Sequence, residues 1–430
     1  MHKTTMYHHF FYMVLVLLPL LSGCGRTTEV QDYAFDFSGA VRKGYEPVTV
    51  QSVYGQTGTY GYDFGTEQNG TDPFFFSVDL PEGNYRVTVV LGGEAAAETA
   101  VKSESRRLML PPVATVPGER VEQVFTVNIR NKYIGETDSV RIKPREVGKL
   151  IWDDKLTLEF SGQNPAVTEI RIDAADELPT IFLAGNSTVV DEGNEPWCGW
   201  GQMFPAFLTA DVVVANYAES GESARSFVGE KRLDKLLTQM KPGDWLFIEF
   251  GHNDQKQSGE GVGAYTTFKD EIKFLADQAR KRGAIPVLVT PMHRRSFDEN
   301  GRIVNTHGDY PDAVRRLAAD EGIYLIDLNA MSKTLYEAWG IEGSKQAFVH
   351  FPAGTFPGQD EPLADNTHFN SYGGYEIGRC IVQGLRDNDI PLQEYIRPEI
   401  GEFDPAQPDD PGSFHIPPTA FLSLQKPDGN

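Results

Sequence analysis

The sequence has few cysteines and few basic residues, and after its first two dozen residues it contains no long apolar run. Only three cysteines occur, and Cys198 and Cys380 lack metal-ligand spacing, so we expect no structural zinc. These two can form one disulfide or remain two buried thiols. Lys and Arg number 39 against 61 Asp and Glu, and the net charge of -22 argues against nucleic acid as a partner. No later segment is long enough to span a bilayer.

Hydrophobic residues make up 40% of the chain and aromatic residues 11%, which is enough for a sizeable core. A length of 430 residues exceeds one typical domain and favours two domains, or one with appendages. Composition predicts a signal peptide at 1–23, a linker at 24–32, a β-sandwich at 33–175, an α/β domain at 176–396 and an extended Pro-rich tail at 397–430.

The N-terminal segment differs in composition from the rest. Lys3 precedes the apolar run from Phe10 to Leu21, and Leu21-Ser22-Gly23-Cys24 follows at once. This pattern resembles the lipobox of bacterial lipoproteins. The resemblance implies cleavage before Cys24, lipidation of its sulfur and an exported protein anchored at the periplasmic or cell-surface face of a membrane. An ordinary signal peptide with a chance cysteine is the alternative.

Residues 33–173 have the alternating short runs and Gly, Pro and Asn clusters of an all-β module, most easily a sandwich. Phe74–Leu80 and Tyr85–Leu91, on either side of a Pro-Glu-Gly-Asn turn, predict a hairpin. Further strands are predicted at Val121–Ile129, Ser139–Ile142, Lys155–Phe160 and Glu169–Ile172. The region resembles galactose-binding-like modules found beside carbohydrate-active enzymes. Aromatic residues of a Gly-rich loop could stack on sugar rings or cap the core: Tyr54, Tyr60, Tyr62 and Phe64.

Beyond residue 180, short apolar runs alternate with amphipathic segments. The runs predict buried strands at Ile181–Ala184, Val212–Asn216, Trp245–Phe250, Ile285–Thr290 and Ile323–Asp327. Helices are predicted around Leu233–Met240 and Phe268–Ala279, with a final helix at Tyr372–Gly384. Such alternation predicts a three-layer α/β/α domain with a parallel sheet.

Unusual residues follow the first three of these strands. Ser187 follows the first, where Gly185 permits a sharp bend in the sequence IFLAGNSTVVD. Gly221 follows the second and can present an unobstructed backbone N–H, and Asn253 follows the third with an amide donor. Because the segments after parallel strands converge at one edge of a sheet, we expect these groups to lie together.

Asp365 and His368 supply the partners that a nucleophilic serine needs. An imidazole removes the proton from the hydroxyl, and a carboxylate holds the imidazole in the correct tautomer. Three residues apart at the predicted start of the last helix, the two side chains can lie on one side. Each residue has a structural alternative as a turn, a cap or a brace. Together they predict a hydrolase site.

Five blocks carry a family resemblance: LAGNSTVVD, NYAESGESARSF, FGHNDQK, VTPMHRR and DNTHFNSYGG. Their order resembles the flavodoxin-like SGNH, or GDSL, hydrolases over about residues 181–389, and within them the rhamnogalacturonan acetylesterases. The resemblance implies Ser187 as nucleophile, His368 as general base and acid, and Asp365 as the group that orients His368. It implies no metal or organic cofactor.

The resemblance also implies an oxyanion hole formed by the N–H groups of Ser187 and Gly221 and by the side chain of Asn253. The sequence departs from the family pattern at one position, because the usual Gly-Asp-Ser is here Gly185-Asn186-Ser187. Asparagine can make comparable turn hydrogen bonds, so we expect the substitution to affect fine tuning more than activity.

Candidates for substrate contact follow the fourth strand and Ser187. His293, Arg294 and Arg295 could bind uronate carboxylates of a pectic backbone, or the arginines could only neutralise neighbouring acidic residues. His307 and Trp197 are further candidates. For Trp197 and for Trp200, core packing is the alternative.

The expected function is that of a serine esterase that removes acetyl groups from pectic polysaccharide or oligosaccharides, rhamnogalacturonan first among them. Its partners would be acetylated plant cell-wall carbohydrate and, through the lipid on Cys24, a membrane. The alternatives are an SGNH esterase for acetylated xylan or another acyl ester, and a catalytically silent carbohydrate-binding lipoprotein.

Overall fold

A computed structural model of the chain describes Met1 and residues 33–40, 42–70 and 72–428. The predicted signal peptide after Met1, the lipidation site at Cys24 and the linker up to residue 32 lie outside the described residues. The described residues from Tyr33 onward belong to one compact unit. None of the helices in the described part of the chain is long and apolar enough to cross a membrane.

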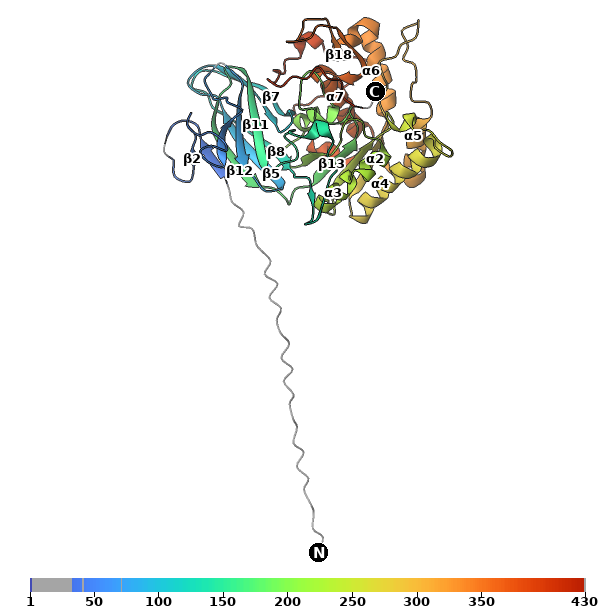
Figure 1. Cartoon of the computed structure of the whole chain (residues 1–430), viewed down its shortest axis with the longest axis horizontal. Coiled ribbons are helices and arrows are strands. Elements are labelled where there is room, and N and C mark those ends of the chain that lie inside the picture. The colour runs from blue at the N-terminus through green and yellow to red at the C-terminus, as the bar shows by residue number, and fades with distance from the viewer. Residues whose placement is uncertain (2–32, 41, 71, 429–430) are drawn as a thin grey trace. The chain divides into compact units, whose positions relative to one another are not determined.

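The first half of this unit is a β-sandwich of two five-stranded sheets (Figure 1). One sheet has the order β2 (Glu46–Pro47), β1 (Tyr33–Asp36), β12 (Val167–Ala174), β5 (Gly83–Leu91) and β8 (Val121–Ile129). The other has the order β3 (Tyr60–Asp63), β4 (Phe74–Asp79), β11 (Lys155–Gln163), β6 (Ala97–Ser103) and β7 (Arg107–Thr115). The alternate apolar residues of both sheets meet in one buried core, as in other sandwiches.

The hairpin predicted from β4 and β5 is wrong, because these strands belong to different sheets. β4 pairs with β3 and β11, whereas β5 pairs with β12 and β8. The connecting turn carries the chain across the sandwich, so that Phe74 and Phe76 and, from the facing sheet, Val87 and Val89 share the core. Face-to-face packing removes both apolar faces from water.

The strand predicted at Ser139–Ile142 is also largely wrong. Only a short ribbon forms there, from β9 (Tyr133–Ile134) and β10 (Asp138–Ser139). After it the chain leaves the sandwich, and the N–H of Arg141 donates to the carbonyl of Glu230 at 2.9 Å. The backbone of this segment therefore bonds to the second half of the unit and not to a sandwich sheet.

The second half contains the predicted parallel sheet, and the predicted α/β class is confirmed. Its order is β14 (Val213–Asn216), β13 (Thr180–Gly185), β15 (Trp245–Glu249), β16 (Ile285–Val289) and β17 (Tyr324–Ile326). The helices are α1 (Trp200–Met203), α2 (Ala224–Gly229), α3 (Arg232–Gln239), α4 (Lys269–Lys281), α5 (Tyr310–Glu321), α6 (Leu328–Gly343) and α7 (Ser371–Asp387).

Alternation along the central strand β13 explains the three layers. Ile181 and Leu183 face a core built with α1, α6 and α7. Phe182 and Ala184 face a second core built with α2, α3, α4 and α5. Since both faces of the sheet are covered, its strands are apolar throughout and the polar functional groups are confined to the strand ends.

A short antiparallel ribbon of β18 (Phe348–Phe351) and β19 (Leu363–Phe369) precedes α7. Asp365 and His368 lie on β19, which corrects their predicted placement at the start of a helix. The helix begins later because Asn370 is its N-cap, with the side chain accepting from the N–H of Gly373.

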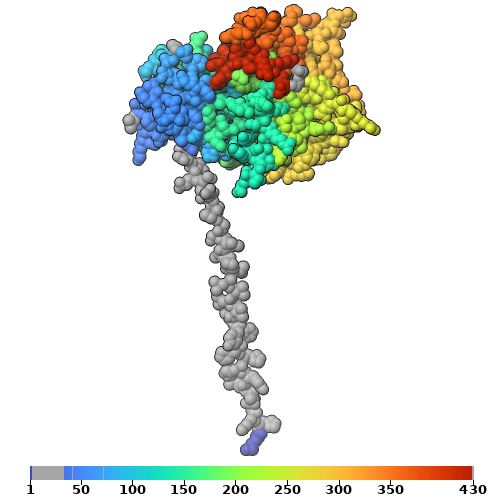
Figure 2. Space-filling view, in the orientation of Figure 1, coloured from blue at the N-terminus to red at the C-terminus, as the bar shows by residue number. Residues whose placement is uncertain are grey.

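Residues 397–428 run along the body of the protein with little regular structure, and their apolar side chains dock at intervals. Phe403 is buried, and Phe414 and Ile416 pack against the core on the α7 side. The last described stretch, Phe421–Asp428, is called the C-terminal strap below. In Figure 2 the red surface of the chain's C-terminal part reaches from the blue surface of the sandwich to the orange surface of the α/β domain.

Candidate active site

Ser187, His368 and Asp365 form a hydrogen-bonded chain. His368 Nε2 lies 3.0 Å from Ser187 Oγ, and His368 Nδ1 lies 2.9 Å from Asp365 Oδ2. All three residues are buried, and Ser187 is only 5% exposed. The geometry is that of a nucleophile, a base and the carboxylate that orients the base.

The carboxylate of Asp365 is held in place by its own backbone turn. Its Oδ1 accepts the N–H groups of Thr367 and His368, at 2.7 and 2.9 Å. Burial alone would raise the pKa of Asp365, but the hydrogen bond and charge interaction with His368 and these backbone N–H groups together hold the pKa well below its usual range. Asp365 therefore remains ionised beside the imidazole.

The turn after β13 can be built only with glycine at position 185. A Cβ on Gly185 would lie 2.6 Å from Val189 Cγ2 and 3.1 Å from the carbonyl oxygen of Glu249. The side chain of Asn186 then closes the turn, because its Oδ1 accepts the N–H of Thr188 at 3.0 Å. This is the turn hydrogen bond expected of asparagine, and it places Ser187 at the carboxyl end of the strand.

Thr188 also shows that Glu249 carries a proton. The Thr188 hydroxyl lies 2.9 Å from Asn186 Oδ1 and 3.0 Å from Glu249 Oε1, although it has one hydrogen to donate. Both contacts are satisfied if Glu249 is protonated on Oε1, while its Oε2 accepts from Trp200 Nε1 at 2.7 Å. Burial raises the pKa of Glu249 to about 8, in agreement with this assignment. Trp200 is therefore a core residue beneath the nucleophile turn.

Two backbone N–H groups at the site are available to a ligand. Among the hydrogen bonds of the described residues, neither Ser187 N–H nor Gly221 N–H has an acceptor. Gly221 has a φ of 82°, which favours glycine. Asn253 donates from Nδ2 to the carbonyl of Glu222 at 2.8 Å, and this bond leaves its second amide hydrogen free. The three groups predicted to form an oxyanion hole are thus competent donors.

The segment between β10 and β11 holds the loop that carries Gly221. Lys143 Nζ donates to the carbonyl of Ser220 and pairs with Glu222 Oε1, both at 2.7 Å. Further along this segment, Lys149 pairs with the buried Glu219 at 2.8 Å. The first half of the unit therefore positions an active-site loop of the second half.

A second tie from the sandwich reaches the loop after Ser187. Arg106, at the turn between β6 and β7, pairs with Glu195 at 2.5 Å and donates to the carbonyl of Trp197 at 2.9 Å. The ring of Trp197 stands edge-on to His368, with 5.8 Å between the ring centroids. Trp197 is 3% exposed, so it acts as a wall that positions the imidazole.

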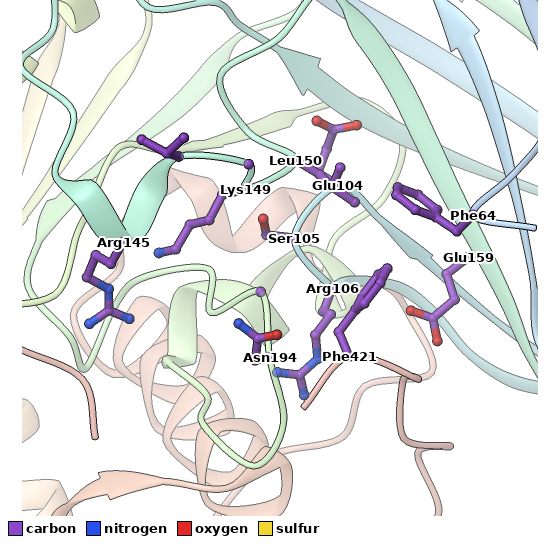
Figure 3. Close-up of a pocket in the computed structure, with 13 residues that line it drawn as sticks. Phe64, Glu104, Ser105, Arg106, Arg145, Lys149, Leu150, Glu159, Asn194 and Phe421 are labelled. Atoms are coloured by element: carbon purple, nitrogen blue, oxygen red, sulfur yellow. The ribbon is translucent and has the colours of Figure 1, made fainter. Parts of the chain in front are cut away.

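A cavity of about 190 Å³ lies where these ties meet the strap, and its lining residues are drawn in Figure 3. Glu104 and Arg106 line it from the sandwich, and Phe421 lines it from the strap. Burial raises the pKa of Glu104 to about 8. The lining cation Arg145 is already paired with Glu192 at 2.8 Å. Ser187 does not line this cavity, which marks a junction between the two halves.

The aromatic side chains of the sandwich's Gly-rich loop contact other parts of the protein. Tyr62 is buried in the sandwich core, and Tyr60 packs against it. The hydroxyl of Tyr54 donates to Asp79. Phe64 lies 5.3 Å from the ring of Phe421, centroid to centroid. The aromatic cluster therefore caps the core and anchors the strap.

The predicted substrate contacts are engaged within the protein. Arg295 donates to Ser344 Oγ and Asn366 Oδ1, both at 2.9 Å, and to the carbonyl of Ile341. It thereby braces the strand that carries Asp365. Arg294 donates to the carbonyl of His252 at 3.1 Å and has no carboxylate partner among the described residues.

Two histidines beside Arg294 are buried and neutral. His307 Nε2 lies 2.9 Å from the carbonyl of Met292. When the amide oxygen and nitrogen of Gln255 are exchanged, the nitrogen donates to His307 Nδ1 at 3.1 Å. Burial lowers the pKa of His307 to about 3 and that of His293 to about 4. The two histidines form the floor behind the third and fourth strand ends.

Cys198 and Cys380 are free and buried, so the second of the two alternatives for these thiols holds. Burial raises the pKa of both thiols. In the described part of the chain no group of three His, Cys, Asp or Glu side chains could hold a metal ion.

Residues 183–374 match the GDSL-like Lipase/Acylhydrolase family. The chain is 44% identical over 218 residues to rhamnogalacturonan acetylesterase RhgT of Bacillus subtilis (strain 168), covering 50% of this chain and 93% of RhgT. It is 35% identical over 219 residues to the probable rhamnogalacturonan acetylesterase YesY of the same organism, covering 50% of this chain and 96% of YesY.

Among solved structures, the crystal structure of protein YxiM from Bacillus subtilis has a TM-score of 0.47 and 25% sequence identity, covering 84% of this chain and 99% of that chain. From the family match and the two sequence relatives, the class of protein is a carboxylic ester hydrolase with an SGNH fold. The chain belongs to the GDSL-like lipase/acylhydrolase family.

Sequence reasoning missed the residues that reach the site from distant segments. Lys143 precedes the predicted α/β domain, and Lys426 and Asp428 belong to the tail. None of them lies in a motif or shares a spacing with the catalytic blocks. Their positions depend on long-range packing, so no local sequence signal could have identified them.

Proposed function

We propose that this protein removes acetyl groups from rhamnogalacturonan, with Ser187 as the nucleophile. The observation that supports this most directly is the 44% identity to rhamnogalacturonan acetylesterase RhgT over 93% of that enzyme. The hydrogen-bonded chain of Ser187, His368 and Asp365 supplies the chemistry.

In the first half of the reaction, Ser187 Oγ attacks the acetyl carbonyl carbon while His368 Nε2 takes the hydroxyl proton. Asp365, ionised and bonded to Nδ1, stabilises the imidazolium that forms. The carbonyl oxygen becomes an oxyanion and receives hydrogen bonds from the N–H groups of Ser187 and Gly221 and from the Asn253 amide. Each such donor is worth about 3 kcal/mol of barrier.

Collapse of the tetrahedral intermediate breaks the bond to the sugar oxygen. His368 gives its proton to that oxygen, so the sugar leaves as an alcohol and the acetyl group stays on Ser187. Water, deprotonated by the same imidazole, then attacks the acetyl-enzyme and releases acetate. The cycle regenerates the free hydroxyl of Ser187.

The test is acetate release from acetylated rhamnogalacturonan by the wild-type protein and by Ser187→Ala. We expect release by the wild type and a loss of at least ~10³-fold in kcat for the variant. Acetylated homogalacturonan and acetylated xylan serve as parallel substrates. A wide preference for xylan, or equal release by both proteins, contradicts the proposal.

We also propose that the mature protein is a lipoprotein attached to a membrane through Cys24. The support is the sequence Leu21-Ser22-Gly23-Cys24 after an apolar run. Cells fed a radiolabelled fatty acid should label the wild-type protein and not Cys24→Ser. If the two proteins label equally, Cys24 is not the lipidation site.

A further inference from the structure

The C-terminal strap is fixed to the protein at both of its ends. At its start, Phe421 lies 5.2 Å from the ring of Phe75, centroid to centroid. Next, Glu195 and the strap exchange two backbone hydrogen bonds, Glu195 N–H to Phe421 O and Ser423 N–H to Glu195 O, each at 2.9 Å. The indole of Trp197 donates to the carbonyl of Ser423 at 2.8 Å. The strap is therefore attached to the wall that positions His368.

The far end of the strap lies over the catalytic groups themselves. Lys426 Nζ is 3.2 Å from Asp365 Oδ2, the same oxygen that contacts His368. A Cβ added to Gly221 would lie 3.0 Å from Asp428 Cβ. The strap thus contacts both the carboxylate of the triad and the glycine of the oxyanion hole.

Lys426 adds to a cluster of positive charge beside Asp365 and Asn253. Lys256 lies 3.2 Å from Asn253 Oδ1, and neither it nor Arg294 pairs with a carboxylate among the described residues. Burial lowers the pKa of Lys256, with Arg294 and Lys426 as the next causes, so each of these two cations is close enough to repel Lys256. Asp365 is a partner of Lys426, but it is shared with His368.

Three clustered cations are unusual in a chain whose net charge is -22. Like charges that share one carboxylate with a histidine raise the free energy of the folded state, and an anionic ligand can supply the missing charge. Lys426 has the freedom to bind one, because its side chain is 50% exposed. The ligand chemistry that fits is a carboxylate on the carbohydrate next to the acetylated sugar.

We propose that the C-terminal strap is part of the substrate site and that Lys426, supported by Lys256 and Arg294, is a specificity-determining residue that binds a uronate carboxylate of the substrate. This inference rests on the proposed carbohydrate esterase function. On substrate binding, the Lys426 ammonium turns from Asp365 to the incoming carboxylate. The strap then contributes to KM for charged substrates.

The experiment compares one acetylated rhamnogalacturonan oligosaccharide before and after reduction of its uronic acids to neutral sugars. Lys426→Gln should raise KM for the charged oligosaccharide about fivefold, the size expected for a half-exposed ion pair. KM for the reduced oligosaccharide should stay within about twofold of the wild type. The matched control is Lys273→Gln, at a surface lysine of α4 that pairs with Asp277 and Glu321. It should leave KM unchanged for both oligosaccharides.

A second variant ends the chain at Ala420 and removes the strap. It should lose the preference for the charged oligosaccharide as Lys426→Gln does, while still cleaving 4-nitrophenyl acetate. Faster cleavage of the charged oligosaccharide by the shortened protein would show that the strap is a cover, and would overturn the proposal. Equal effects of Lys426→Gln on the charged and reduced oligosaccharides would also overturn it.

Failure of the proposed function gives a different result. In that case the wild type cleaves 4-nitrophenyl acetate but releases no acetate from rhamnogalacturonan. The same comparison is then made with acetylated homogalacturonan and its reduced form. If Lys426→Gln raises KM only for the charged form, the role of the strap is supported. If KM for the charged form is unchanged, the role is refuted.

Discussion

Lys143 Nζ donates to the carbonyl oxygen of Ser220 at 2.7 Å, and through this bond a residue outside the α/β domain holds the loop that carries Gly221. The same ammonium would lie 3.3 Å from a Cβ on Gly221. Because the buried Glu222 pairs with Lys143 as well, the loop is fixed by charge as well as by hydrogen bonding. The sandwich is therefore a structural part of the catalytic site and not only an appendage.

Replacing Lys143 should slow the chemical step more than it weakens binding. In Lys143→Met the Ser220 carbonyl loses its partner and the Gly221 N–H is less well placed, so we expect kcat to fall about 10- to 100-fold, with KM within about threefold. Lys143→Arg keeps the charge and should recover part of the rate. The control is Lys132→Met, at a lysine that lies over the Tyr133 ring. A variant with altered KM and normal kcat would contradict this role.

Gly221→Ala should reduce activity with little loss of stability. The positive φ of 82° and the 3.0 Å approach to Asp428 Cβ mean that a methyl group forces the loop or the strap to shift. Loss of one oxyanion donor costs about 10²- to 10³-fold in kcat, and a displaced donor costs somewhat less. Steady-state rates on 4-nitrophenyl acetate and a thermal melt measure the two effects. A variant as fast as the wild type would show that the Gly221 N–H does not contact the oxyanion.

Asp365→Asn should leave the fold intact and reduce kcat about 10³- to 10⁴-fold, since the amide favours the wrong imidazole tautomer. The pKa of Asp365 is held well below its usual range, so the carboxylate is ionised at neutral pH. As pH falls, kcat/KM of the wild type should therefore decrease with the slope of a single proton. A slope of two on the acid side would indicate that Asp365 titrates as well.

Glu249→Gln should change the pH dependence of stability. The folded protein keeps the Glu249 proton up to a pKa of about 8, whereas the unfolded chain releases it near pH ~4.3. Between these values the folded state binds more protons than the unfolded state, so the contribution of Glu249 to stability is lost as pH rises. Glutamine has no proton to lose and can still donate to Thr188 and accept from Trp200.

Urea unfolding of both proteins at pH 5 and pH 8 measures this effect. Between the two pH values, Glu249→Gln should gain at least ~1 kcal/mol of unfolding free energy relative to the wild type. Other buried carboxyl groups such as Glu104 are common to both proteins and cancel in the comparison. Identical pH dependences would mean that Glu249 is ionised in the folded state.

The parts of the fold that sequence reasoning predicted best are those governed by local patterns. The apolar runs of β13 to β17 could be assigned because strands buried on both faces are continuously hydrophobic. The pairing partners of β4 and β5 could not, because a turn sequence does not say whether the next strand joins the same sheet or the facing one. His368 was expected at a helix start, but the cap at Asn370 begins the helix later.

The sequence by itself determined which side chains could perform the chemistry. Ser187, Gly221, Asn253 and the pair Asp365 and His368 follow strands or stand in short motifs, and parallel strands bring their ends to one edge. Tertiary structure alone decided what surrounds them. Lys143 and Lys426 reach the site from segments far away along the chain, and their contacts follow from the packing of the whole unit, which neither periodicity nor spacing encodes.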